Sequence, residues 1–173
     1  MGNYTAVTLQ NQGSQFVTAA SDVATAITDV SPLPDFTFAA GSLQPGNIIR
    51  VTAVGAFVSS SGATNLTLQI MYGGTGGTSL FTTGAVTLTA SAGNSFKVES
   101  IIRILTTGTS GTCMVDSRYQ GISTTANVGV PVMVRSASVT IDTTTAKTLI
   151  LAATQGVALT SFNVDTFLIE QLN

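Results

Sequence analysis

Apolar side chains recur at every second position in several stretches of this chain. Residues 64–72 show the pattern with Leu66, Leu68, Ile70 and Tyr72. Residues 95–106 repeat it with Phe96, Val98, Ile102 and Ile104, and charged side chains occupy positions between them. Successive side chains of a β-strand point to opposite faces, so this spacing predicts strands with one face in a core and one toward solvent. Glu, Lys, Gln and Arg, which favour helices over strands, are scarce.

The apolar stretches are separated by clusters of Gly, Ser and Asn, which favour turns. The clearest clusters, where we expect loops, are 59–65, 73–77, 91–95 and 107–112. The expected strands are 48–58, 64–72, 95–106, 112–120, 132–141, 147–153 and 161–172, with shorter candidates at 4–9, 23–29, 35–39 and 79–89. Residues 17–30 fit a helical turn or a strand, and their Thr and Val favour a strand. Roughly eight to ten antiparallel strands at this spacing predict an all-β sandwich or barrel.

The length of 173 residues suits one domain with its own core. Residues 1–15 are polar apart from Tyr4, Val7 and Leu9, so we expect an N-terminal arm that is mobile or lies on a neighbouring molecule. The domain itself is expected to span residues 16–173. Its end, FNVDTFLIEQLN, has the pattern of an apolar strand.

Charged side chains are rare, because Asp, Glu, Lys and Arg make up 8% of the chain against about 25% in a typical globular protein. A free monomer usually keeps apart from its neighbours through a charged surface. Uncharged, flat surfaces instead favour packing against other chains. The composition therefore indicates a building block that assembles with copies of itself or with a partner shell.

Two of the expected strands carry apolar residues on both faces. In residues 48–58, Val54, Ala56 and Val58 lie opposite Ile49, Val51 and Phe57. In residues 161–172, Phe167 and Ile169 are expected on the face opposite Phe162, Val164 and Leu168. A strand that is apolar on both faces is buried on both. The candidate interface between copies of the chain is thus Val54, Ala56, Val58, Phe167 and Ile169, and the alternative is that a loop or the arm covers these residues.

Several classes of protein are disfavoured by what the sequence lacks. The six basic residues are scattered, which argues against binding to nucleic acid or to a membrane surface. There is no histidine and only one cysteine, Cys113, so neither a disulfide scaffold nor a common zinc or nucleophilic site is expected. We expect Cys113 to be a small buried side chain. No cofactor or metal site is predicted, and the N-terminus has no signal-peptide pattern.

Two places could still carry chemistry or bind a ligand. Glu99 and Asp116 lie on the solvent side of strands that can be neighbours, as a glycosidase pair would. Arg103 and Arg118 lie near them, so cross-strand ion pairing is the favoured interpretation, and we expect no enzymatic activity. The run YGGTGG lacks the lysine of a phosphate loop and reads as a hairpin loop. Tyr72, at its start, is a possible ligand contact.

The order of motifs resembles that of a known family. Residues 34–57 read PDFTFAAGSLQPGNIIRVTAVGAF, and they are followed by NLTLQIMYGGT, TTGAVTLTASAGNSFKVESIIRI and a final strand ending IEQLN. Over about residues 33–173 the chain resembles structural proteins of tailed bacteriophages that have a single trimeric jelly-roll domain of the tumour-necrosis-factor-like kind.

The resemblance implies a jelly-roll sandwich that forms a homotrimer on the virion, as a decoration or cement protein on the capsid surface. Its partners would be further copies of itself and a major capsid protein, and it would be made in the host bacterial cytoplasm. Two alternatives remain open at this stage. One is a tail, baseplate or fibre protein, and the other is a carbohydrate-binding or receptor-binding sandwich that uses Tyr72.

Overall fold

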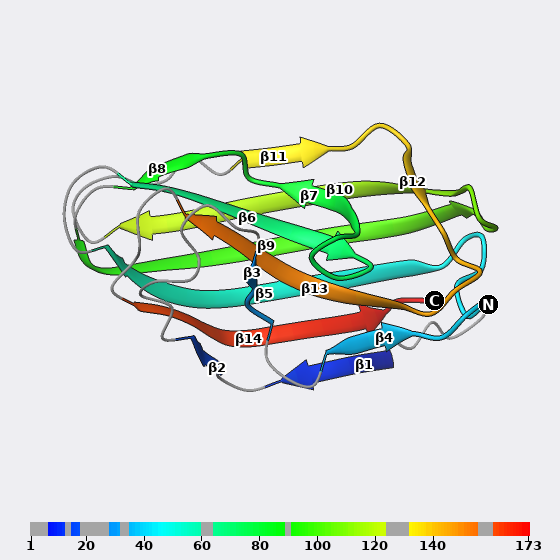
Figure 1. The fold of residues 1–173 in the computed structure, drawn as a ribbon, viewed down its shortest axis with the longest axis horizontal. Helices are drawn as coiled ribbons and strands as arrows, with labels where there is room; N and C mark the ends of the chain where they lie inside the picture. Colours follow the sequence, from blue (N-terminus) through cyan, green and yellow to red (C-terminus); the bar gives the residue numbers. More distant parts are fainter. Residues whose placement is uncertain are drawn as a thin grey trace.

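The computed structural model describes residues 7–12, 15–17, 28–31, 35–59, 64–88, 91–123, 132–155 and 161–173. Their regular structure consists of two antiparallel β-sheets packed face to face as a sandwich (Figure 1). The all-β class predicted from the alternation of apolar side chains is confirmed. Among the described residues, there is no helix with the length and hydrophobicity needed to cross a membrane.

The larger sheet has eight strands, six of them in the order β1-β14-β5-β9-β10-β11, with β12 beside β10 and β2 beside β14. The strands are β1 (Val7–Gln12), β2 (Gln15–Val17), β5 (Ile48–Ser59), β9 (Ser91–Thr106), β10 (Gly111–Ser123), β11 (Val132–Arg135), β12 (Val139–Ile141) and β14 (Ser161–Gln171). Four long strands, β14, β5, β9 and β10, form its centre (Figure 1).

The smaller sheet has six strands, four of them in the order β3-β13-β6-β7, with β4 beside β13 and β8 beside β6. The strands are β3 (Thr28–Asp29), β4 (Phe36–Phe38), β6 (Thr64–Tyr72), β7 (Thr78–Thr82), β8 (Val86–Leu88) and β13 (Lys147–Gln155). Because β7 contacts β10 and β12, one side of the sandwich is formed by β7, β8, β10, β11 and β12. The opposite side is formed by β1, β14, β3 and β4 (Figure 1).

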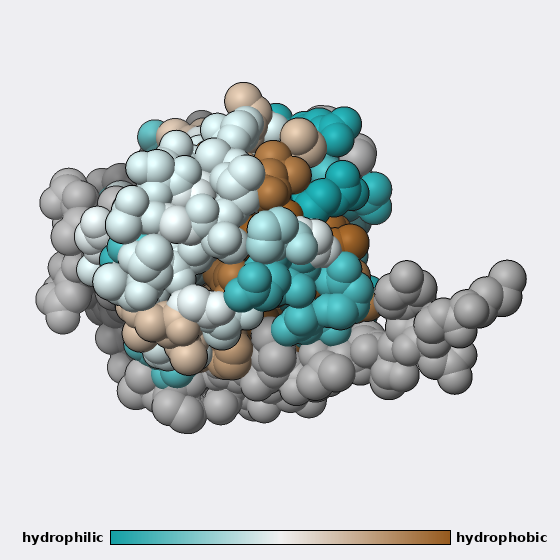
Figure 2. Space-filling model, turned by 90° about the vertical axis from the view of Figure 1, so that its right-hand side faces the viewer, coloured by the Kyte–Doolittle hydropathy of each residue, from teal (hydrophilic) through white to brown (hydrophobic). Residues whose placement is uncertain are grey.

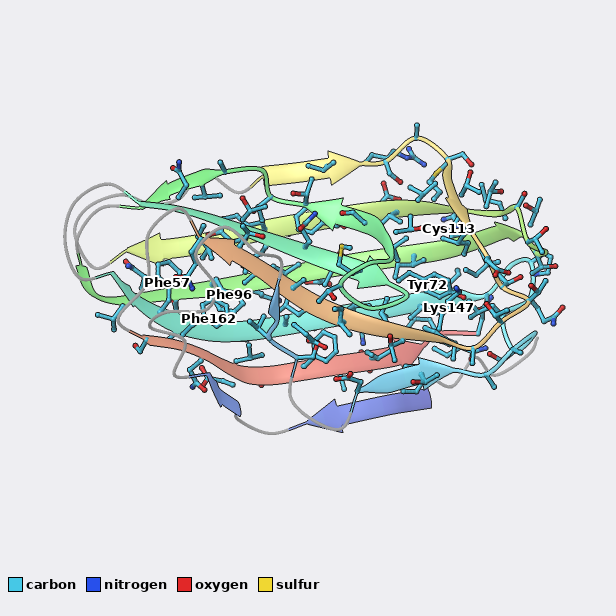
Figure 3. The ribbon with its side chains drawn as sticks, viewed as in Figure 1. Phe57, Tyr72, Phe96, Cys113, Lys147 and Phe162 are labelled. Carbon is cyan, nitrogen blue, oxygen red and sulfur yellow. The ribbon has the colours of Figure 1, made fainter. Side chains whose placement is uncertain are left out.

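The core lies between the sheets and follows the predicted alternation. Leu66, Leu68 and Ile70 of β6 are at most 1% exposed, and Val98 and Ile104 of β9 meet them from the larger sheet. At one end, three rings stack, with centroid distances of 6.5 Å for Phe57–Phe96 and 5.3 Å for Phe96–Phe162 (Figure 3).

Gly55 is needed beside these rings. A Cβ atom at this position would lie 2.1 Å from the carbonyl oxygen of Asn163 and 2.8 Å from the Phe96 ring. Gly55 therefore lets β5 and β14 approach each other where the ring of Phe96 packs.

A second apolar cluster lies outside the main core. Met71, Ile150 and Ala152 are 3%, 1% and 0% exposed and contact one another. Their neighbours Leu149, Leu151 and Ala153 point into the main core, so alternation directs Ile150 and Ala152 to the outer face of the smaller sheet. Both faces of β13 are therefore buried.

Most strand predictions agree with the structure, and four need comment. Residues 91–95, predicted as a loop, lie in β9, because pairing with β5 continues to Ser91 and satisfies the backbone of these small residues. Residues 79–89 and 132–141 each contain two strands with a short break. Of residues 17–30, positions 18–27 lie outside the described residues, while Thr28–Asp29 is a strand.

Residues 7–12, part of the expected N-terminal arm, pair with β14 of the same chain. This segment therefore belongs to the larger sheet. Whether the arm also contacts a neighbouring molecule, and whether the domain begins at residue 16, stay predictions.

Candidate functional site

The outer face of the larger sheet has an uncharged region on its central strand. Val54, Ala56 and Val58 of β5 are partly exposed, while Val51, Ala53 and Phe57 point into the core. Thr166 of β14 pairs with Val54, and Ser95 of β9 pairs with Ala56. We call these five outward residues, Val54, Ala56, Val58, Ser95 and Thr166, the neutral strip. It contains three of the five predicted interface residues.

The other two predicted interface residues lie elsewhere. Phe167 and Ile169 are 0% exposed and belong to the main core with Phe162 and Val164. The prediction that they face away from Phe162 was wrong, because the pairing of β14 with β5 shifts register between Val164 and Thr166. An extra residue in one strand reverses the alternation beyond it. Leu168 is consequently the outward, partly exposed side chain.

Much of the remainder of this outer face is charged. Five of the six basic residues of the chain lie on it, interleaved with Glu99, Asp116 and Glu170. These basic residues are Arg50, Lys97, Arg103, Arg118 and Arg135. They are scattered in the sequence, and the antiparallel pairing of β5, β9, β10 and β11 brings them together. Sequence reasoning missed this grouping, because it depends on the register of strands far apart in the chain.

The charged side chains form ion pairs across and along the strands. Arg50 Nη2 lies 2.7 Å from Glu170 Oε2, and these side chains are 37% and 12% exposed. Arg50 Nε also donates a hydrogen bond to the same oxygen at 2.7 Å. Lys97 Nζ lies 3.2 Å from Glu99 Oε2. Of these pairs, Arg50–Glu170 is the least exposed and makes the strongest contact.

Glu99 and Asp116, the possible catalytic pair, lie on the neighbouring strands β9 and β10, as predicted. Glu99 is directly opposite Arg118, but Asp116 pairs with Arg135 of β11, whose Nε lies 3.3 Å from Asp116 Oδ1. Arg135 also donates a hydrogen bond to the Met114 sulfur at 3.3 Å. Each carboxylate thus has a basic group beside it, which fits the ion-pair interpretation.

A shallow groove of about 470 Å³ lies over this region. Its walls include Glu99, Ile101, Asp116, Arg118, Val134 and Arg135. Val134 is 39% exposed, and the groove therefore combines an apolar surface with guanidinium groups. That combination is typical of surfaces that bind proteins.

Tyr72 is not a surface platform. Its side chain is 5% exposed, and its hydroxyl donates a hydrogen bond to the carbonyl oxygen of Asp142 at 3.1 Å (Figure 3). Burial, together with the nearby charge of Asp142, raises the pKa of Tyr72 to about 12. The ring belongs to the main core, so its face is not available to stack on a sugar in this structure.

The glycine loop after Tyr72 is a hairpin loop, as predicted. Gly73 and Gly74 have φ values of 100° and 74°, which glycine adopts without strain. Gly73 N–H donates to the carbonyl oxygen of Thr148 at 2.7 Å. Opposite the loop, Lys147 Nζ lies 4.0 Å from Asp142 Oδ2, and hydrogen bonds from Thr144 and Thr145 hold the pKa of Asp142 below its usual value. This end of the molecule is near-neutral in hydropathy on one side and hydrophilic on the other, with a narrow hydrophobic band between them (Figure 2).

Cys113 is a buried side chain of β10, as predicted, with 0% exposure. Burial raises the pKa of its thiol to about 11, which keeps it protonated and unreactive at neutral pH. Within the described parts of the chain, no group of three or more His, Cys, Asp or Glu side chains could hold a metal ion. Asp22 lies outside those parts.

The fold and these surfaces define an all-β protein made of two antiparallel sheets packed as a sandwich. No protein-family model, curated protein or solved structure matches this chain.

Proposed function

We propose that this chain is a non-enzymatic structural protein of a bacteriophage virion. In this proposal it forms a homotrimer that decorates the capsid surface and stabilises the head as a cement protein. The observation that carries the proposal is the neutral strip, an uncharged and partly exposed surface along the central strand of the larger sheet, whose outer face also carries three ion pairs. Uncharged patches of this kind are suited to packing against another protein.

The pairing of strands supports a jelly roll as the finer description of the sandwich. In a jelly roll a long antiparallel hairpin is rolled up, so that the first strand pairs with the last, the second with the second-last, and so on inward. Here β1 pairs with β14, β4 with β13, β5 with β9, and β6 with β7. The hairpin formed by β9 and β10, together with β11 and β12, extends the larger sheet beyond this set.

The proposed mechanism is mechanical. Cross-strand pairing and a closely packed core make the sandwich a rigid body, and the neutral strips pack against neighbouring copies. The trimer would bind the assembled major capsid protein and neither nucleic acid nor membrane. A protein that binds only the assembled shell stabilises it by about 1.4 kcal/mol for each tenfold excess over its Kd.

The first test is the mass of the purified chain, measured by light scattering over a range of concentrations. We expect a trimer, and we expect Val54→Asp to dissociate it, because packing the strip would bury the new carboxylate without a partner. Thr109→Asp, in the exposed turn after β9, introduces the same group away from the strip and should leave the mass unchanged. A monomer at every concentration would rule out the homotrimer.

The second test places the protein on the particle. Phage particles that lack this chain should lose infectivity faster than complete particles under heat or osmotic shock, and electron microscopy should show the trimers on the head. Equal survival would contradict the cement role. Trimers found only on the tail or its fibres would support the alternative structural role instead.

A further inference from the structure

The charged residues are divided between the two sides of the sandwich. The basic side consists of the outer faces of β9, β10 and β11. It has a net charge of +2, because it carries four basic side chains and two acidic ones. The bases are Lys97, Arg103, Arg118 and Arg135, and the acids are Glu99 and Asp116. The acids on this side each lie within 3.3 Å of a basic group, in the pairs Lys97–Glu99 and Arg135–Asp116.

The opposite side is acidic. Three acids on or beside β3, β4 and β14 give this side a net charge of −3, namely Asp29, Asp35 and Asp165. Of these acids, Asp35 and Asp165 are exposed. A fourth acid, Glu170 of β14, lies on the outer face of the larger sheet beside Arg50, and this ion pair is neutral. The remaining charges are the Asp142–Lys147 pair at the end of the sandwich and Asp22, outside the described residues.

The basic side also has the apolar surface that a protein contact needs. Among the described residues, Leu105 and Val134 are the only exposed large hydrophobic side chains, at 37% and 39% exposure. Leu105 is on β9, and Val134 is on β11 beside the groove of about 470 Å³. Charge and exposed apolar surface thus coincide on one side of the molecule.

We propose that copies of this chain associate head to tail, with the basic side of one copy against the acidic side of the next. The occupant of the groove is a second copy, because the same chain carries a surface of complementary charge on its opposite side. Such a contact leaves one basic and one acidic side free on every growing assembly, so it either continues or closes into a ring. A ring of three is the homotrimer of the proposed function, on which this inference rests.

The test reverses the charges of each side separately and then together. Arg118→Glu with Arg135→Glu makes both sides acidic, and Asp35→Lys with Asp165→Lys makes both sides basic. Each double variant should raise the dissociation concentration of the assembly by about tenfold or more, since like charges then face each other. The variant with all four substitutions has the polarity of the molecule inverted, and its association should return to within about threefold of the wild type.

Analytical ultracentrifugation in low and high salt supplies the readout, and the wild-type assembly should weaken as salt rises. Arg135→Glu alone is compared with Lys147→Glu, which changes the net charge equally but lies on neither side. Circular dichroism and thermal unfolding verify that each variant is folded.

The outcomes separate the inference from the proposed function. If the wild type is a trimer and neither double variant associates more weakly than it, or only one of them does, the head-to-tail contact is overturned. If Val54→Asp still dissociates that trimer, the proposed function survives without this inference. A wild-type chain that remains monomeric overturns both.

Discussion

The two sheets of this sandwich present different outer faces. On the smaller sheet, Ile150 and Ala152 of β13 are 1% and 0% exposed and contact Met71 in a buried apolar cluster. On the larger sheet, Val54 and Ile101 occupy equivalent outward positions, but they are partly exposed and have charged neighbours.

Alternation of apolar residues identifies the inner faces of both sheets, yet it does not distinguish a covered outer face from one exposed to solvent. In β13 every position from Leu149 to Ala153 is apolar, and this continuous run indicates that the outer face is covered as well. A short strand that is apolar at every position is buried on both faces.

Replacing one isoleucine on each outer face gives the largest difference that we predict. Ile150→Ala should lower the free energy of unfolding by about 3 kcal/mol, because it removes buried methylene groups and leaves a cavity. Ile101→Ala should cost less than about 1 kcal/mol, because its side chain is already partly in water. Urea unfolding of both variants measures the difference. Equal costs would mean that Ile101 is covered in solution, as an assembled interface would require.

The ion pairs of the larger sheet offer a smaller contrast within one face. Glu170→Gln should cost about 1 kcal/mol, since Glu170 is 12% exposed and its pair with Arg50 spans 2.7 Å. Asp116→Asn should cost about 0.3 kcal/mol or less, since both partners in the Asp116–Arg135 pair are about half exposed or more, at 49% and 66%. Thermal unfolding at low and high salt compares them. A larger loss for Asp116→Asn would show that the groove is more enclosed in solution than in the structure.

Part of the candidate site could be predicted from the sequence. Glu99 and Asp116 were predicted on the solvent side of strands that can be neighbours, and β9 and β10 are neighbours. The pairing of Glu99 with Arg118 could not be predicted from the turn after β9, because the register of β9 against β10 shifts between Thr112 and Cys113. The partner of Asp116 could not be predicted either, because Arg135 reaches it through β11, after an intervening stretch of chain. Such pairing depends on tertiary packing, and no periodic pattern in the sequence predicts it.

Two errors at the candidate site have a common cause. Phe167 was assigned to the wrong face because strict alternation across residues 161–172 takes no account of the register shift near Asp165. Tyr72 was named as a possible ligand contact because it adjoins a glycine loop, whereas its place in the alternating series of β6 already directed it into the core. In both cases the alternation within the strand had to be followed residue by residue, including its interruption.

Asp29 tests through its pKa how well the outer face of the smaller sheet is covered. It pairs with Ala152 across β3 and β13, which places it on the outer face of the smaller sheet. Burial raises the pKa of Asp29 above its usual value, although hydrogen bonds from Ser31 act in the opposite direction. The protonated form is therefore favoured by folding, and this stability is present below about pH 4 and lost as the pH rises through the raised pKa.

Asp29→Asn removes the ionisation while its amide oxygen can still accept the hydrogen bond from Ser31 N–H, which spans 2.8 Å in the wild type. At pH 7 the variant should be more stable than the wild type, by less than about 1 kcal/mol because the carboxyl is only partly buried. Below about pH 4 the two should converge, since Asp29 is then neutral in both the folded and unfolded states. Urea unfolding at a series of pH values measures this. A variant that is less stable than the wild type at pH 7 would mean that hydrogen bonding outweighs burial, and that this edge of the covered face is open to water.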